Sequence, residues 1–221
     1  MHTWVLTLRR TYQHHRDPKD AAAMEAYMKG VAPFFGIKAG PRRELLKEHL
    51  ATHGVPTVDE LPTVVREAFA CPERELHHTA VDLLTKQARK LGPEQLPWIE
   101  DALTTKSWWD TVDALATHVV GTILKRHPGS IPPWNERWIS SADLWLNRTA
   151  ILFQNRWKAD ADLDLLFANI DRHAARPEFF LRKAIGWALR EASATNPEAV
   201  RHYVGSRTLS PLSVREALRK L

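Results

Sequence analysis

The chain of 221 residues contains one cysteine, Cys71, which excludes an internal disulfide and a cysteine-rich metal site. A lone cysteine is typical of proteins in a reducing compartment, so we expect a cytoplasmic protein, of the bacterial cytosol and nucleoid. Residues 1–10 lack the apolar core of a signal peptide, and no later run approaches the length of a membrane span. These absences argue against both a secreted disulfide scaffold and a membrane protein.

Motifs of metal and nucleotide chemistry are also missing. The pairs His14-His15 and His77-His78 are adjacent, not spaced by one helical turn, and no His-Glu-x-x-His occurs. The chain has no glycine-rich dinucleotide fingerprint, no P-loop and no Gly-x-Ser-x-Gly elbow. We therefore expect no metal and no cofactor.

Strand signals are absent too, because no alternating β-branched run and no Asn-Gly or Asp-Gly turn occurs. Several prolines instead precede good helix formers, which is the first-turn use of proline, and Asp17, Asn196 and Ser210 stand where caps are expected. The predicted helices are 2–15, 18–29, 41–52, 58–69, 73–90, 94–104, 107–125, 133–139, 142–157, 162–173, 177–194, 197–206 and 211–220.

The helix starts recur so that a two-helix unit spans about 35 to 40 residues, close to a HEAT-type repeat. This spacing predicts an all-α solenoid with a concave face, and a compact helical bundle is the alternative. No linker or break in composition divides the chain, so we expect a single domain, residues 1–221.

The stretch 107–113 (SWWDTVD) opens the longest apolar helix. We expect the Ser107 hydroxyl to cap its first amides, with Asp110 near the positive end. The residues Trp108, Val112, Leu115, Val119 and Ile123 form a complete core stripe. Trp109 and Asp113 lie one turn apart on a neighbouring face, outside this stripe. Asp113 therefore caps another helix, pairs with an arginine, or serves as a carboxylate at the edge of a cleft.

Positive charge is concentrated near the C-terminus. The whole chain carries a formal charge of +5, and residues 171–221 alone hold ten Arg and Lys against five Asp and Glu. Lys183, Trp187 and Arg190 share one helix face, away from the apolar stripe. This face is either a solvated basic surface or a phosphate-binding surface with an aromatic platform. Arg148, inside an apolar run, is either ion-paired or in contact with phosphate.

Five blocks together resemble the AlkD-like DNA alkylation repair glycosylases over nearly the whole chain. They are 106–113 (KSWWDTVD), 26–29 (AYMK), 33–38 (PFFGIK), 144–154 (LWLNRTAILFQ) and 178–191 (EFFLRKAIGWALRE). The resemblance implies a right-handed superhelix of HEAT-like repeats with a basic groove for duplex DNA. It also implies a monomer that excises cationic N3- and N7-alkylated purines without metal or cofactor.

The same resemblance implies roles for individual residues. The catalytic trio falls on Trp109, Trp187 and Asp113, with the carboxylate stabilising an oxocarbenium-like sugar and positioning water between two indoles. The arginines that contact the DNA backbone fall on Arg148, Arg190 and, as a third contact, Arg43, and Tyr27 falls on a cleft-lining position. Lys183 joins these expected DNA-binding residues because it shares the basic helix face with Arg190. A cationic partner is expected to keep Asp113 ionised. In one departure, Ala39-Gly40 stands before Pro41 where the family often has a hydroxyl residue, so a hydroxyl contact to DNA is lost.

Two other functions remain open. A non-catalytic HEAT-repeat scaffold would bind DNA or protein, although the presence of the full trio argues against it. A glycosylase for self-resistance to a DNA-alkylating natural product would share every motif and differ in accepting bulky adducts.

Overall fold

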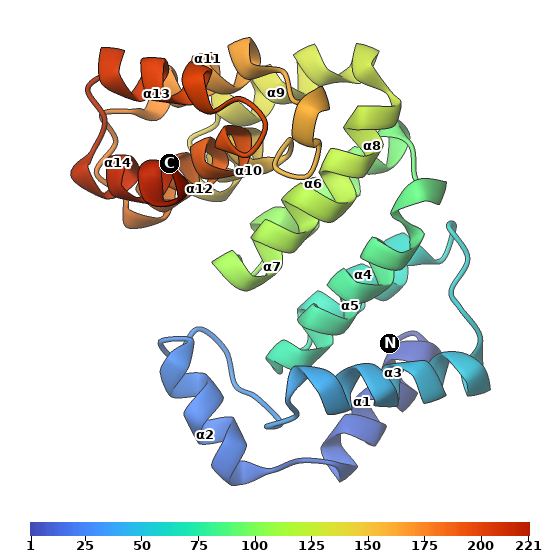
Figure 1. The fold of residues 1–221 in the computed structure, drawn as a ribbon. Coiled ribbons are helices and arrows are strands. Elements are labelled where there is room, and N and C mark those ends of the chain that lie inside the picture. Colours follow the sequence, from blue (N-terminus) through green and yellow to red (C-terminus); the bar gives the residue numbers. More distant parts are fainter. The chain divides into compact units, whose positions relative to one another are not determined.

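The computed structural model describes residues 1–221, and the chain is helical with no strand, which confirms the all-α prediction (Figure 1). Its contacts divide it into two compact units. Unit 1 comprises residues 1–91 and 97–111, and unit 2 comprises residues 92–96 and 112–221. The predicted single domain stays a prediction, and each unit is described by itself.

In unit 1, α1 and α5 each pack against both α3 and α4. Its helices are α1 (Thr3–His14), α2 (Pro18–Tyr27), α3 (Ala39–His53), α4 (Leu61–Ala70), α5 (Arg74–Gln87) and most of α6 (Leu96–Thr104). A smaller cluster of Ala21, Met28 and Phe34 is buried beside α2, and Trp108 and Trp109 pack against it partly buried.

Unit 2 centres on α10 and α12, which pack against each other and against α9, α11, α13 and α14. Its helices are α8 (Gly121–Arg126), α9 (Ile131–Ile139), α10 (Leu144–Leu152), α11 (Leu163–His173), α12 (Phe179–Ser193), α13 (Pro197–Ser206) and α14 (Pro211–Ala217). None of the chain's helices combines the length and apolar character needed to cross a lipid bilayer.

The predicted helix 107–125 is present but not uniform. It consists of α7 (Trp109–Ala114), a π-helical turn at Leu115–Val120 and α8, and the Gly121 amide closes the π-helical turn on the Ala116 carbonyl. Gly121 lies so close to the C-terminal end of α10 that a Cβ there would be 2.2 Å from the Phe153 carbonyl oxygen. The predicted stripe residues from Val112 onward are fully buried, whereas Trp108 is only partly buried.

Helix starts mostly follow the predicted chemistry. Asp17 accepts hydrogen bonds from the Lys19 and Asp20 amides, and Ser210 accepts one from the Ser213 amide. Two details were wrong. Asn196 occupies the capping position without a side-chain capping bond. The Ser107 hydroxyl donates back to the Leu103 carbonyl instead of capping α7.

Candidate functional site

Asp113 faces Arg148 in unit 2. The Nε of Arg148 donates to Oδ1 of Asp113 at 2.7 Å, and its Nη2 donates to Oδ2 at 2.8 Å. Such a bidentate pairing fixes the carboxylate in plane and favours its ionised form. The arginine side chain is 5% exposed and the aspartate side chain 18% exposed, so the pair is largely desolvated and the carboxylate retains some contact with solvent. The sequence left arginine pairing of Asp113 open, and the structure identifies Arg148 as a partner.

The guanidinium of Arg148 also links two helices. Its Nη1 donates to the carbonyl of Phe180, in the first turn of α12, while the rest of the group holds Asp113 on α7. Arg148 itself sits on α10, whose start is capped by the Asp143 carboxylate. One buried arginine thus connects the candidate catalytic carboxylate with the helix that carries Trp187.

The basic face of α12 is organised by a carboxylate that the sequence did not single out. Glu216, on α14, lies 3.0 Å from the Lys183 ammonium and 2.8 Å from Nη1 of Arg190. The hydrogen bond from Lys183 is the main reason that the pKa of the Glu216 carboxyl is lowered. Trp187 stands between Lys183 and Arg190 in the sequence, and its side chain is partly buried. Its indole N–H donates to Glu191 at 3.2 Å.

A glycine allows Glu216 to approach α12. A Cβ on Gly186 would meet the Glu216 Cβ at 2.5 Å and the Ser213 carbonyl oxygen at 3.0 Å. Only a residue without a side chain therefore lets α14 pack at this distance. The long-range pairing of Glu216 with Lys183 and Arg190 had no signal in the sequence, because 26 residues separate Glu216 from Arg190.

Trp109 belongs to unit 1, where it packs partly buried against the cluster of Ala21, Met28 and Phe34. The Tyr27 ring is 71% exposed and meets the Trp109 ring edge to face, with ring centroids 6.3 Å apart. The two predicted cleft residues of unit 1 are therefore neighbours.

Arg43, the third predicted arginine, is exposed on α3. Its side chain is 64% exposed and its Nε lies 3.6 Å from Asp82. The adjacent Arg42 is buried and makes the shorter contact to the same carboxylate, at 2.9 Å. An exposed, loosely paired guanidinium remains available to an anionic ligand.

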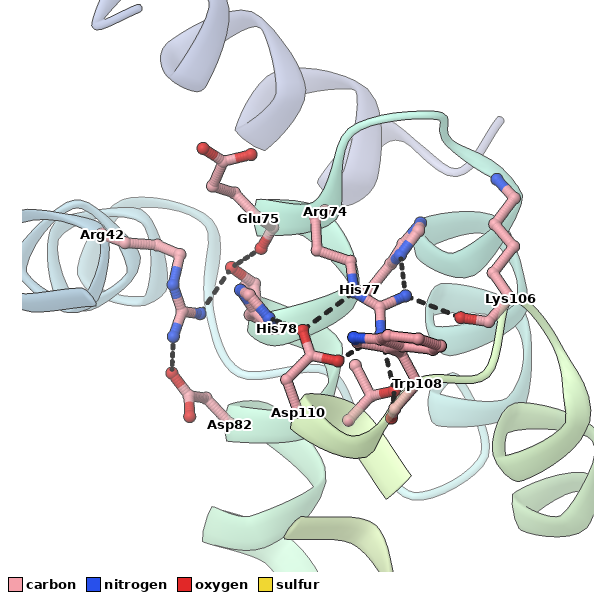
Figure 2. A network of polar contacts seen from close by, with 11 residues as sticks. Arg42, Arg74, Glu75, His77, His78, Asp82, Lys106, Trp108 and Asp110 are labelled. Atoms are coloured by element: carbon pink, nitrogen blue, oxygen red, sulfur yellow. Dashed lines mark hydrogen bonds and ion pairs between the residues drawn. The ribbon is translucent and has the colours of Figure 1, made fainter. Parts of the chain in front are cut away.

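A buried polar network surrounds Asp110, the residue after Trp109 in the chain, and sequence reasoning missed it (Figure 2). Arg74 is fully buried and holds Asp110 through Nε at 3.0 Å and Nη2 at 2.5 Å. His78 contacts the same carboxylate through Nε2 at 2.5 Å. Burial alone would raise the pKa of the Asp110 carboxyl, but the hydrogen bonds from His78 and Arg74 hold it well below its usual range. Asp110 lies in the first turn of α7, as expected, and its carboxylate also pairs with Arg74 and His78.

The predicted trio is thus divided between the units. Trp109 belongs to unit 1, and Asp113 and Trp187 belong to unit 2, so their joint arrangement around a sugar stays a prediction. No cluster of three or more His, Cys, Asp or Glu side chains suited to a metal ion occurs in the chain.

Comparison with known proteins places these residues in context. A family model described as DNA alkylation repair enzyme matches residues 8–221. The chain is similar to the solved structure of a predicted DNA alkylation repair enzyme from Enterococcus faecalis, with 32% identity and a TM-score of 0.87. That match covers 93% of this chain and 96% of the other.

Two more distant structures share the fold. AlkD2 from Streptococcus mutans has 18% identity and a TM-score of 0.61, over 83% of this chain and 89% of its own. Smu.31 from Streptococcus mutans UA159 has 18% identity and a TM-score of 0.62, over 81% of this chain and 92% of its own. Among curated proteins, none matches the chain.

Proposed function

Because this chain belongs to the DNA alkylation repair enzyme family, we propose that it is a DNA glycosylase acting on duplex DNA. Its proposed substrates are cationic purines alkylated at N3 or N7, and its reaction is hydrolysis of their N-glycosidic bond. The observation that carries this proposal is the carboxylate of Asp113, which Arg148 holds by two hydrogen bonds and whose side chain is 18% exposed.

The chemistry of the substrate explains why one carboxylate is enough. An N3- or N7-alkylated purine is positively charged and leaves as a neutral base, so its departure needs no general acid. Ordinary glycosides, by contrast, need a second carboxyl group to protonate the leaving oxygen. The remaining requirement is to stabilise positive charge that develops on the sugar and to position a water molecule. A preorganised, ionised carboxylate does both.

Arg148 prepares Asp113 for this role. Its guanidinium fixes the orientation of the carboxylate before substrate binds, so little reorganisation is needed as charge develops. It also neutralises the carboxylate in part, so the reaction depends on the negative charge that Asp113 retains beside the sugar. The indoles of Trp109 and Trp187 are proposed to hold the cationic sugar and base by cation–π contact.

The proposed DNA contacts are Arg190, Lys183, Arg43, Tyr27 and Arg148. Lys183 and Arg190 flank Trp187 and share a single carboxylate, Glu216, so two cations face one anion there. Phosphate can take over part of that pairing when DNA binds. The three hydrogen bonds of Arg148 use three of its five N–H groups, so a phosphate contact by this residue has to coexist with its hold on Asp113.

Release of 7-methylguanine from a duplex oligonucleotide under single-turnover conditions tests the proposal, with Asp113→Asn as the paired control. We expect release by the wild-type protein well above spontaneous depurination, and little by the variant. Tight DNA binding without release of 7-methylguanine or of any bulkier cationic adduct would refute the glycosylase assignment and favour a scaffold. Release restricted to bulky adducts would favour the self-resistance alternative.

A further inference from the structure

Two adjacent charged residues, Arg74 and Glu75, open α5 and are both fully buried. Burying an ion is costly unless hydrogen bonds replace its hydration, and a buried ion pair often contributes little to net stability. In sequence the pair looks like an ordinary solvated first turn. Stability alone therefore does not explain why both Arg74 and Glu75 are completely buried.

Glu75 holds the loop that precedes α3. Its carboxylate accepts hydrogen bonds from three consecutive amides, Phe35 at 3.0 Å, Gly36 at 2.8 Å and Ile37 at 3.0 Å. The amide of Arg74 adds a fourth bond to the loop, to the Pro33 carbonyl at 2.9 Å.

The loop depends on glycine for this close fit. Gly36 has a positive φ of 93°, and a Cβ there would lie 2.0 Å from the Asp17 carbonyl oxygen. The same loop carries Phe34, one of the three buried residues against which Trp109 packs. Glu75 thus fixes the surface on which the indole rests.

Arg74 holds the backbone segment that carries the same indole. Its guanidinium grips Asp110, the residue after Trp109, and donates through Nη1 to the Lys106 carbonyl at 2.7 Å (Figure 2). Lys106 has a positive φ of 46°, which is uncommon for a residue with a side chain and needs support from its surroundings. The ammonium of Lys106 adds a bond to the Cys71 carbonyl at 2.6 Å. The backbone is therefore held on both sides of the Trp108-Trp109 pair.

We propose that Arg74 and Glu75 are positioning residues for Trp109, an inference that rests on the proposed role of this indole in base excision. Arg74 fixes the start of α7 through Asp110 and Lys106, and Glu75 fixes the loop that supports the ring. Neither side chain needs to touch DNA. Their joint effect is to give Trp109 one orientation before substrate binds, which is how a remote group contributes to a rate.

The variants that test this proposal are Arg74→Lys, Asp110→Asn and Glu75→Gln. Lysine keeps the charge of Arg74 and removes the planar fork that reaches Asp110 and Lys106 together. Asp110→Asn removes the charge of the other member of the Arg74–Asp110 ion pair. The test can therefore be made if either Arg74→Lys or Asp110→Asn folds. Glutamine keeps one acceptor oxygen for the loop amides and loses the other. The matched control is Arg42→Lys, a second buried arginine of unit 1, whose polar partners are Asp82 and Thr79 in place of Asp110 and Lys106.

Three measurements are made on each folded variant: free energy of unfolding, affinity for undamaged duplex, and single-turnover release of 7-methylguanine at saturating protein. We expect release to fall about 10- to 100-fold in the three variants, the scale of a misplaced catalytic group. DNA affinity should stay near the wild-type value. Arg42→Lys should lose stability as the test variants do and keep its rate of release per folded molecule.

Fluorine NMR of fluorotryptophan-labelled protein supplies a readout that does not depend on catalysis. The Trp109 resonance, assigned with Trp109→Phe, should shift or broaden in the three variants while the buried Trp138 resonance stays in place. Variants that keep both the wild-type rate and the Trp109 resonance would overturn the inference, as would an equal loss of rate in Arg42→Lys. If the wild-type protein releases no base, the proposed function fails, and the resonance alone still decides whether Arg74 and Glu75 position the indole.

Discussion

Asp113 and Arg148 are 35 residues apart in sequence and are joined by two hydrogen bonds of 2.7 and 2.8 Å. The geometry makes the arginine part of the carboxylate's environment before any DNA is present. An arginine aimed only at phosphate would lie exposed, and this one is 4% exposed. The pair therefore behaves as a unit, and changes to either member are expected to affect both stability and chemistry.

The first prediction concerns Asp113→Asn. Asparagine removes the negative charge proposed to stabilise the sugar, and its NH₂ group faces a guanidinium that can only donate. Base release should fall by about 10²-fold or more, with DNA binding near the wild-type value. Single-turnover excision of 7-methylguanine measures this. Asp160→Asn makes the same chemical change at a carboxylate that is 71% exposed, and it should leave the rate unchanged.

The second prediction separates the roles of two arginines. Arg190→Ala removes a proposed phosphate contact and should lower the salt dependence of DNA binding by roughly one unit of slope, for all duplex sequences alike. Arg148→Ala should in addition cost about 1–3 kcal/mol of unfolding free energy, because it leaves the Asp113 carboxylate without its partner. Fluorescence anisotropy at several salt concentrations and urea denaturation provide the two readouts. An Arg148→Ala variant with an unchanged salt slope would confine this residue to holding Asp113.

The third prediction distinguishes an aromatic cradle from core packing. Trp109 and Trp187 are both partly buried, whereas Leu115 is fully buried. Alanine at either tryptophan should cost less than the roughly 3–5 kcal/mol typical of a buried large aromatic, and should abolish excision. Leu115→Ala should cost about 2–5 kcal/mol with little effect on chemistry in the folded fraction. Tryptophan variants that unfold as readily as Leu115→Ala and retain their activity per molecule would identify the indoles as core.

The fourth prediction concerns pH. Burial is the main reason that the pKa of His77 is lowered to about 4, and burial also lowers the pKa of His49 to about 4. Both histidines are neutral when folded and take up a proton on unfolding at any pH between their folded and unfolded values. Their stabilising contribution is therefore fully present above about pH 6.5 and is lost as the pH falls towards 4.

Urea denaturation between pH 7.5 and pH 4.5 measures this loss, with uptake of roughly one proton per histidine expected near pH 5. His77→Gln should flatten the pH dependence, although it lowers stability throughout. The same substitution at exposed His202 should leave the curve unchanged. A stability that is independent of pH across this interval would contradict the buried neutral state of His77.

The fifth prediction compares two glycines. Gly186→Ala forces a Cβ to within 2.5 Å of Glu216, so α14 has to move and its pairing with Lys183 and Arg190 is disturbed. We expect a loss of about 1–3 kcal/mol. Gly205→Ala is the control, because no atom lies within 4 Å of the added Cβ and a helical alanine should stabilise by up to about 1 kcal/mol. Chemical denaturation of both variants measures whether the change in unfolding free energy is negative for Gly186→Ala and positive for Gly205→Ala.

Local chemistry made much of the helical architecture predictable from sequence. Asp17 with Pro18 marked the start of α2, and the spacing of Val112, Leu115 and Val119 identified residues that are fully buried. These features depend only on near neighbours along the chain. The start of α3 was displaced by two residues, because Ala39 and Gly40 are helical before Pro41.

Pairings between distant residues could not be predicted in this way. Arg74 and Asp110 are 36 residues apart, and each looked like an ordinary charged residue of a first turn. Burial is a property of the assembled fold, so no sequence pattern indicated that Arg74 and Asp110 form an ion pair. The partnership of Asp113 with Arg148 was left open for the same reason, and resemblance identified the residues without showing that they are bonded.

The π-helical turn at Leu115–Val120 affects how relatives of this protein can be aligned. A π-turn accommodates one residue more than an α-turn, which rotates the residues before it by about 100° relative to those after it. A relative with an unbroken α-helix would need a gap of one position between Asp113 and Gly121. Without that gap, an alignment anchored on Gly121 would pair Asp113 with a neighbouring residue and would score the proposed catalytic carboxylate as missing.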